Sequence, residues 1–359
     1  MKKLRTAALL LSPALLLLFA QAGGAAPTQR NVKKTSTPIW KLAIDGPRVA
    51  YASGNRIHVW NIATGATSVV AGKYDNVRFT SQLAIAGKRV AWIKDQQFGN
   101  TEEGEKLYTA SISGKAKMIH SVYRHGVDDP TLTNGGWIEG LVGSGNGIAV
   151  STWRSNGTTA TDEQLSLVTS RGLSPLAGGP GAIVASSKDG GHIADLLTSP
   201  WSDSRSVSIY STAGDMLQQV ALDPPDANTT GTEIAISGNL LVVLTTRLFE
   251  PSGPTTVTLQ VYDWTTGDLL NTWPVGINHY GGEVSFSVVG KLAAVQGPSR
   301  LHLVDLDTGK DVTLVRSGRP GWPPALDSRG LVYATGSAVK GSNKLTFVPM
   351  AKLLAMVSG

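Results

Sequence analysis

The sequence predicts an all-β fold, most simply a β-propeller of seven four-stranded blades. The prediction rests on a recurring unit of apolar segment, turn and apolar segment, on glycine turns within the units, and on strands that alternate with period two. The units are marked by Gly46, Gly87, Gly145, Gly190, Gly238, Gly290 and Ser328, at intervals of 38 to 58 residues. Repeats of about 40 to 50 residues are typical of propeller blades. Six or eight blades stay open as alternatives, because the longest interval has room for irregular structure.

The first segment of the chain is typical of an export signal. Lys2, Lys3 and Arg5 precede an apolar run over residues 7–20, and small residues follow. Because this run is shorter than the roughly 20 residues that span a bilayer, we expect residues 1–26 to be a cleaved signal peptide. We therefore expect an exported, monomeric domain in the periplasm or the extracellular space, with no membrane span in the mature chain.

The composition argues against several classes of function. Removing Lys2, Lys3 and Arg5 leaves 29 basic against 26 acidic residues, so a nucleic-acid partner is not expected. The chain has no cysteine, which excludes disulfides and thiol chemistry. Its 41 glycines and 18 prolines indicate many turns and few long helices. No cofactor and no bound metal are expected either.

Each unit continues into a second pair of strands, closed in all but the seventh unit by another glycine turn. These turns contain Gly65, Gly114, Gly172, Gly214, Gly267 and Gly309. The strands that enter them alternate, as Val257, Leu259 and Val261 show. The seventh unit needs an outer strand from elsewhere, either from residues 351–357 or from the N-terminal segment 27–38. We favour the N-terminal segment, which would close a propeller domain of residues 39–359 and cover exposed sheet edges.

Three of the turns share an Asp or Asn four residues before glycine, at Asn61, Asp263 and Asp305. The stretch VYDWTTGDLLNTW from Val261 resembles the repeats of quinoprotein-like propellers. The segment SSKDGGHIADLLTSPWSDSRSVSIYSTAGDML from Ser186 resembles the blades of TolB-like exported propellers. The two resemblances imply blade architecture over residues 38–350. We interpret the shared motif as turn chemistry, in which the side-chain oxygen accepts backbone N–H groups and glycine takes a positive φ.

The longer connections are predicted on one rim of the ring, which makes that rim the candidate functional face. The candidate ligand-binding residues there are Tyr123, Arg124, His125, Asp128, Asp129, Trp153, Trp201, His279 and Tyr280. Their histidines and carboxylates suit a metal or acid–base site, or alternatively a solvated polar loop, which we favour because no metal-ligand spacing is present. The tryptophans suit a contact surface for a protein or a sugar, or alternatively cover blade edges.

The leading functional hypothesis is a non-catalytic propeller that binds a protein or another envelope or extracellular ligand through this rim. An alternative is a hydrolase or lactonase-like enzyme, with its site at the mouth of the central channel. A third is a structural role in a larger assembly. A propeller fold suits all three, so the fold by itself does not decide among them.

Overall fold

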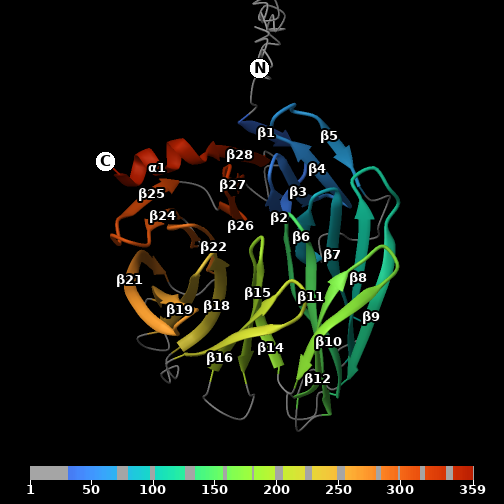
Figure 1. Ribbon diagram of the computed structural model, residues 1–359. Coiled ribbons are helices and arrows are strands. Elements are labelled where there is room, and N and C mark those ends of the chain that lie inside the picture. The colour runs from blue at the N-terminus through green and yellow to red at the C-terminus, as the bar shows by residue number, and fades with distance from the viewer. Residues whose placement is uncertain are drawn as a thin grey trace, which may run out of the picture.

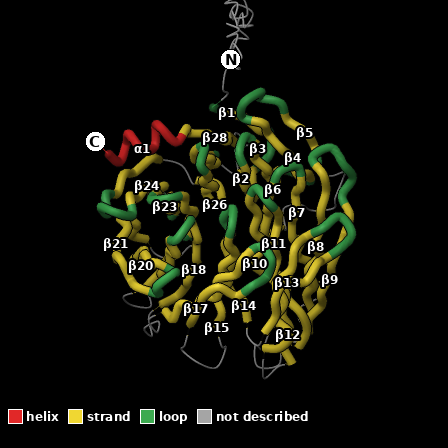
Figure 2. The backbone as a smooth tube through the Cα atoms, in the orientation of Figure 1, coloured by secondary structure: helices red, strands yellow, loops and turns green. Residues whose placement is uncertain are grey.

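The computed structural model describes residues 31–70, 80–97, 102–125, 134–156, 160–179, 182–198, 205–222, 229–248, 255–279, 284–297, 300–315, 320–336 and 343–358. Within these ranges the chain forms 28 strands and one helix, α1 (Met350–Ser358) (Figure 2). The strands form seven antiparallel blades of four, which confirms the predicted β-propeller (Figure 1).

The strands fall into four layers from the centre of the ring outward. The first strands are β2 (Ile39–Asp45), β6 (Thr80–Ala86), β10 (Asn134–Ser144), β14 (Ala182–Lys188), β18 (Thr229–Ser237), β22 (Ser285–Val289) and β26 (Pro320–Asp327). The second strands are β3 (Arg48–Ser53), β7 (Arg89–Gln97), β11 (Gly147–Asn156), β15 (His192–Thr198), β19 (Leu240–Leu248), β23 (Leu292–Gln296) and β27 (Gly330–Thr335). The third strands are β4 (Arg56–Asn61), β8 (Glu102–Ser111), β12 (Ala160–Val168), β16 (Arg205–Ser211), β20 (Thr255–Asp263), β24 (Leu301–Asp305) and β28 (Asn343–Pro349). The fourth strands are β5 (Thr67–Val69), β9 (Lys117–His125), β13 (Leu173–Gly179), β17 (Met216–Leu222), β21 (Asp268–His279), β25 (Asp311–Val315) and, in blade 7, β1 (Val32–Thr35).

The blades pack around the centre through their first strands. Strand β2 contacts both β6 and β26, and the contacts continue from β6 through β10, β14, β18 and β22 back to β26. The core lies between neighbouring blades, as in the cluster that joins Val49 and Tyr51 of blade 1 to Val332 and Phe347 of blade 7. Burying a side chain of this size contributes roughly 1.5–3 kcal/mol. The seams between blades therefore supply most of the hydrophobic stabilisation.

Strand β1 joins the two ends of the chain. It pairs with β28 in antiparallel register, from Val32 opposite Thr346 to Thr35 opposite Asn343. The N–H of Phe347 also donates a hydrogen bond of 2.8 Å to the carbonyl of Asn31. Residues 351–357, the other segment considered for this position, are helical and belong to α1.

Helix α1 packs on blades 6 and 7, where Figure 1 shows it beside β25 and β28. Leu353 and Val357 are buried, and they are four residues apart, so they lie on one face of the helix. They pack in a cluster with Leu301 and Leu331 of the two blades. The helix thus covers an apolar surface that blades 6 and 7 would otherwise expose.

The Asp/Asn-to-glycine motifs form tight turns, as interpreted from the sequence. The Asp305 carboxylate accepts hydrogen bonds from the N–H groups of Asp307 and Thr308, at 2.9 and 3.0 Å. Gly309 has a φ of 73° and donates its N–H to the Asp305 carbonyl at 2.8 Å. Asn61 and Asp263 make the corresponding contacts. These side chains are engaged with their own backbone.

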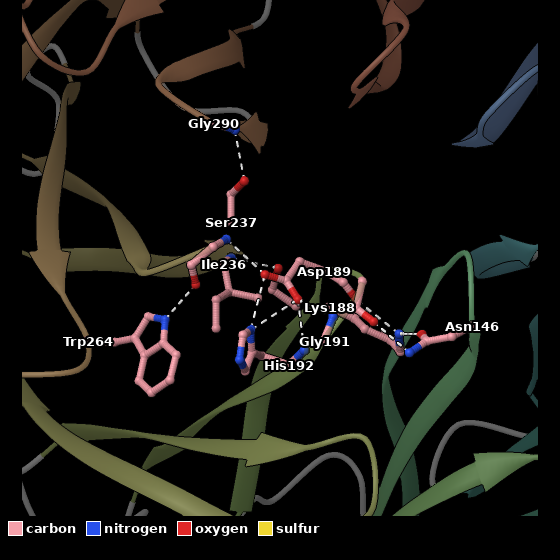
Figure 3. A network of polar contacts seen from close by, with 12 residues as sticks. Asn146, Lys188, Asp189, Gly191, His192, Ile236, Ser237, Trp264 and Gly290 are labelled. Atoms are coloured by element: carbon pink, nitrogen blue, oxygen red, sulfur yellow. Dashed lines mark hydrogen bonds and ion pairs between the residues drawn. The ribbon is translucent and has the colours of Figure 1, made fainter. Parts of the chain in front are cut away.

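The rim that carries the turns between first and second strands, here called the hairpin rim, is held together by hydrogen bonds from blade to blade. Figure 3 shows part of this network, running from Asn146 through Lys188 and Asp189 to Ser237 and Gly290. Each of the seven seams has at least one bond between a side chain and the neighbouring backbone, either at this rim or, for Gln82 to Leu141 and Ser287 to Leu326, between the first strands of the two blades. The bonds are Asp327 to Gly46, Asp45 to Gly87, Gln82 to Leu141, Asn146 to Gly190, Asp189 to Gly238, Ser237 to Gly290 and Ser287 to Leu326.

Candidate functional site

The opposite rim, here called the loop rim, carries the connections between second and third strands and between successive blades. Of the residues predicted for a site there, Asp128, Asp129, Trp201 and Tyr280 lie outside the described residues. His279 pairs through its backbone with Thr255 at the end of β21. The structure therefore places four of the predicted residues in detail, Tyr123, Arg124, His125 and Trp153, and all four lie in blades 2 and 3.

Blades 2 and 3 differ from the other blades in that the described strands form one continuous eight-stranded sheet. The end of β9 pairs with the start of β10, His125 opposite Asn134 and Arg124 opposite Gly135. Their strands are also long, with 10 residues in β8 and 11 in β10. We call the loop-rim ends of β7 to β12 the blade 2–3 extension.

Glycine permits the two blades to join at this point. Gly135 has a φ of 143°, and a Cβ atom added there would lie 2.3 Å from the carbonyl oxygen of Tyr123. Any larger residue would push β9 and β10 apart. The junction, and with it the position of Arg124, therefore depends on this glycine.

Arg124 is the centre of a buried ion-pair network. Its side chain is 11% exposed and donates to the Glu103 carboxylate at 2.6 Å and to the Glu105 carboxylate at 2.9 Å. The second oxygen of Glu105 accepts the backbone N–H of Ile138 at 2.6 Å. Burial raises the pKa of Glu105, although this N–H and the guanidinium both act to lower it. The network fixes β8, β9 and β10 relative to one another.

Two tryptophans stack beside this network. The rings of Trp137 and Trp153, which lie opposite each other on β10 and β11, are 4.1 Å apart and inclined by 3°. The Arg124 guanidinium lies 5.3 Å from the centre of the Trp137 ring, in range of a cation–π interaction. The indole N–H of Trp153 donates to the Glu139 carboxylate at 3.4 Å. Burial raises the pKa of Glu139 to about 7.

The side chains next to Arg124 along β9 lie on the other face of the strand, because successive side chains alternate. Tyr123 is 41% exposed, and its ring meets the ring of His125 edge to face at 4.6 Å. His125 Nδ1 lies 3.4 Å from a carboxylate oxygen of Glu102. A hydrogen bond to Glu102 raises the pKa of the Tyr123 phenol. Tyr123 and His125 thus form an exposed aromatic surface.

A cavity of about 520 Å³ lies in the blade 2–3 extension. Its volume is within the range of small-ligand sites. Polar side chains and glycines from five strands make up most of its lining. The lining residues are Gln96, Gly104, Glu105, Lys106, Ser121, Val122, Tyr123, Asn134, Gly135, Gly136, Arg154 and Ser155.

A second polar group lies between blades 3 and 4. Asp195 is fully buried, and Ser151 donates to it at 3.2 Å. Burial raises the pKa of Asp195 to about 6. Glu163, which is 5% exposed, has a pKa raised to about 7 by burial and by the charge of Asp195. No described cation bonds to either carboxyl, so burial shifts the protonation equilibrium of both towards the protonated form.

Sequence reasoning missed Trp137, Glu103, Glu105 and Glu139. The alternation of Glu103 and Glu105 places them on one face of a strand, which is a readable pattern. The Trp137–Trp153 pair depends on the register of β10 against β11 and has no local pattern. Among the described residues, no three His, Asp or Glu side chains lie close enough to hold a metal ion. No described helix is long and apolar enough to cross a membrane.

Comparison with protein-family models and with curated proteins finds no match. Among solved structures, the chain is similar to hydrazine synthase of Kuenenia stuttgartiensis, with 13% identity, a TM-score of 0.59 and coverage of 89% of this chain and 98% of that one. It is also similar to the β-propeller domain of the trilobed protease of Pyrococcus furiosus, with 11% identity, a TM-score of 0.53 and coverage of 87% of this chain and 95% of that one. A PL25 ulvan lyase matches with 9% identity, a TM-score of 0.51 and coverage of 91% and 98%. At these identities the likeness shows the fold, a β-propeller, and nothing about activity.

Proposed function

We propose that this protein is an exported, non-catalytic β-propeller that binds a protein or another envelope or extracellular ligand at the blade 2–3 extension. The observation that carries the proposal is the cavity of about 520 Å³ beside the rigid Arg124 network. Binding sites on rigid scaffolds lose less conformational entropy when the ligand arrives. The basic, apolar N-terminal segment supports export.

Two features of the extension favour recognition. Tyr123 is exposed beside the cavity, and tyrosine provides a large contact area at low conformational cost. The Trp137–Trp153 stack and the Glu103–Arg124–Glu105 network keep the strands behind it in one arrangement. A rigid wall with exposed aromatic and polar groups suits binding.

Site-specific photo-crosslinking tests this proposal. A photoreactive phenylalanine analogue replaces Tyr123 in the full chain, produced in its native host, and the same analogue replaces Met216 as the control. Met216 is 64% exposed on β17, away from the extension. We expect a discrete cross-linked species from position 123 and none from position 216. Absence of that species, or equal products from both positions, would refute binding at the extension.

A hydrolase or lactonase-like activity is the second candidate, and Glu139 is the observation that favours it. A carboxyl with a pKa of about 7 suits proton transfer near neutral pH. Turnover of a panel of esters and lactones by the wild type, lost in Glu139→Gln, would support this candidate. Turnover that survives the substitution would remove Glu139 from the chemistry.

A further inference from the structure

The cavity in the blade 2–3 extension carries an imbalance of charge. Three of its lining residues are of charged types, namely Glu105, Lys106 and Arg154. Both oxygens of Glu105 are engaged, one by Arg124 and the other by the N–H of Ile138. Within the described part of the chain, neither Lys106 nor Arg154 has a carboxylate partner. The charge left for a ligand is therefore positive.

The neighbouring strands add to this positive potential. Lys94 on β7 lies directly opposite Lys106 on β8. The charge of Arg154 also acts, after burial, to lower the pKa of His120 on β9. Lys106 of β8 and Arg154 of β11 thus bring two cations to one cavity, where a bound anion would interact with both.

The rest of the lining indicates which class of molecule bears the anionic group that would bind here. Gln96, Ser121, Asn134 and Ser155 provide amide and hydroxyl groups, and Val122 is the one aliphatic side chain. Binding of a peptide generally requires apolar pockets for its side chains. A sugar presents hydroxyl groups in several directions, which match the amide and hydroxyl groups of this lining. Tyr123 supplies an aromatic ring at the same place.

We propose that the cavity binds an acidic saccharide, whose carboxylate or sulfate groups are held by Lys106 and Arg154. This inference rests on the proposed function and specifies its ligand class. Charge-assisted hydrogen bonds to such groups are stronger than neutral ones and weaken as ionic strength rises. Replacing either cation with a neutral side chain should then reduce the affinity about ten-fold or more.

Calorimetric titration of the full chain tests the ligand class. The probes are trigalacturonate, sulfated maltotriose, neutral maltotriose and triglutamate. We expect one or both acidic sugars to bind, with an affinity that falls at high salt, and the neutral sugar not to bind. Equal binding of triglutamate would overturn the saccharide assignment. Binding of maltotriose as tight as that of the acidic sugars, or no binding of either acidic sugar, would overturn the proposal.

Three variants locate the site. Arg154→Gln and Lys106→Gln each remove one cavity cation, and Arg171→Gln is the control because Arg171 lies in the exposed turn between β12 and β13 on the hairpin rim. We expect a loss of affinity in the first two and none in the control. An equal loss in all three would show non-specific attraction and would overturn the site. If cross-linking from Tyr123 succeeds while no acidic sugar binds, the binding function stands and the ligand class fails.

Discussion

The carboxylate of Asp45 in blade 1 accepts a hydrogen bond of 2.9 Å from the backbone N–H of Gly145 in blade 3. Its other oxygen accepts the N–H of Gly87 in blade 2 at 2.6 Å. One side chain thus links three consecutive blades at the hairpin rim. A carboxylate has two acceptor oxygens and no donor, which suits two amides that approach from different blades.

Replacing Asp45 should weaken the ring. Asp45→Asn puts an NH₂ group where one of the amides now donates, so one charge-assisted hydrogen bond is lost and one backbone N–H loses its acceptor. We expect the free energy of unfolding to fall by about 1–3 kcal/mol in chemical denaturation. Asp268→Asn is the matched control, since Asp268 is exposed at the start of β21. A loss of the same size in the control would contradict the assigned role.

Gly135→Ala should separate β9 from β10. The added Cβ would lie 2.3 Å from the Tyr123 carbonyl oxygen and 2.5 Å from the Arg124 Cα, and the φ of 143° disfavours any side chain. We expect a loss of roughly 2–4 kcal/mol in unfolding free energy, together with changed tryptophan fluorescence from the nearby stack. Gly190→Ala is the control, because an added Cβ meets nothing within 4 Å there. A fully stable Gly135→Ala protein would show that the junction tolerates a side chain.

The stability of the blade 3–4 seam should depend on pH through Asp195. Its pKa is raised from 3.8 to about 6 in the folded state, so the folded protein binds a proton that the unfolded chain has released. The resulting stabilisation is complete below pH 4 and is lost as the pH rises towards 6. About two pKa units correspond to about 3 kcal/mol. Asp195→Asn should therefore become more stable relative to the wild type as the pH rises from 4 to 7, as thermal unfolding at each pH would show. If the melting temperatures of the two proteins changed in parallel with pH, Asp195 would not be the source of the pH dependence.

Truncation of the N-terminus should open the ring. A chain that begins at residue 36 lacks β1, so β28 keeps its pairing with β27 but loses its outer partner and becomes an exposed edge. We expect a lower melting temperature and concentration-dependent aggregation in light scattering. A chain that begins at residue 27 keeps β1 and is the control. Equal melting temperatures would mean that the pairing of β1 with β28 adds little to stability.

The sequence predicted the parts of this fold that are encoded locally. The turns at Gly65, Gly267 and Gly309 depend on residues at most four positions away, so their chemistry could be read directly. Residues 351–357 are one of the two segments that the sequence offers for the outer strand of blade 7. Leu353 and Val357 are four residues apart, however, and they pack on blades 6 and 7 as one face of a helix. Packing against blades 6 and 7 therefore stabilises this segment as a helix rather than as a strand.

The candidate site could be predicted only in part. Tyr123, Arg124, His125 and Trp153 were chosen for their chemistry and their place near long connections, and the structure places all four in blades 2 and 3. The partners of Arg124 are Glu105 and Glu103, which lie 19 and 21 residues away along the chain. The Trp137–Trp153 stack depends on strand register, and the cavity depends on how β9 meets β10. Such relationships are set by three-dimensional assembly and leave no local pattern.

The pairing of β1 with β28 also constrains the order of folding. Val32 lies in the first described strand, and its partner Thr346 lies in the last described strand. Local contacts form faster than contacts between distant residues, so each blade can form its hairpins before the ring closes. Strand β1 stays without its partner until β28 is available to pair with it. We therefore expect the closure of the ring to be a late step of folding, because it joins the first and the last of the described strands.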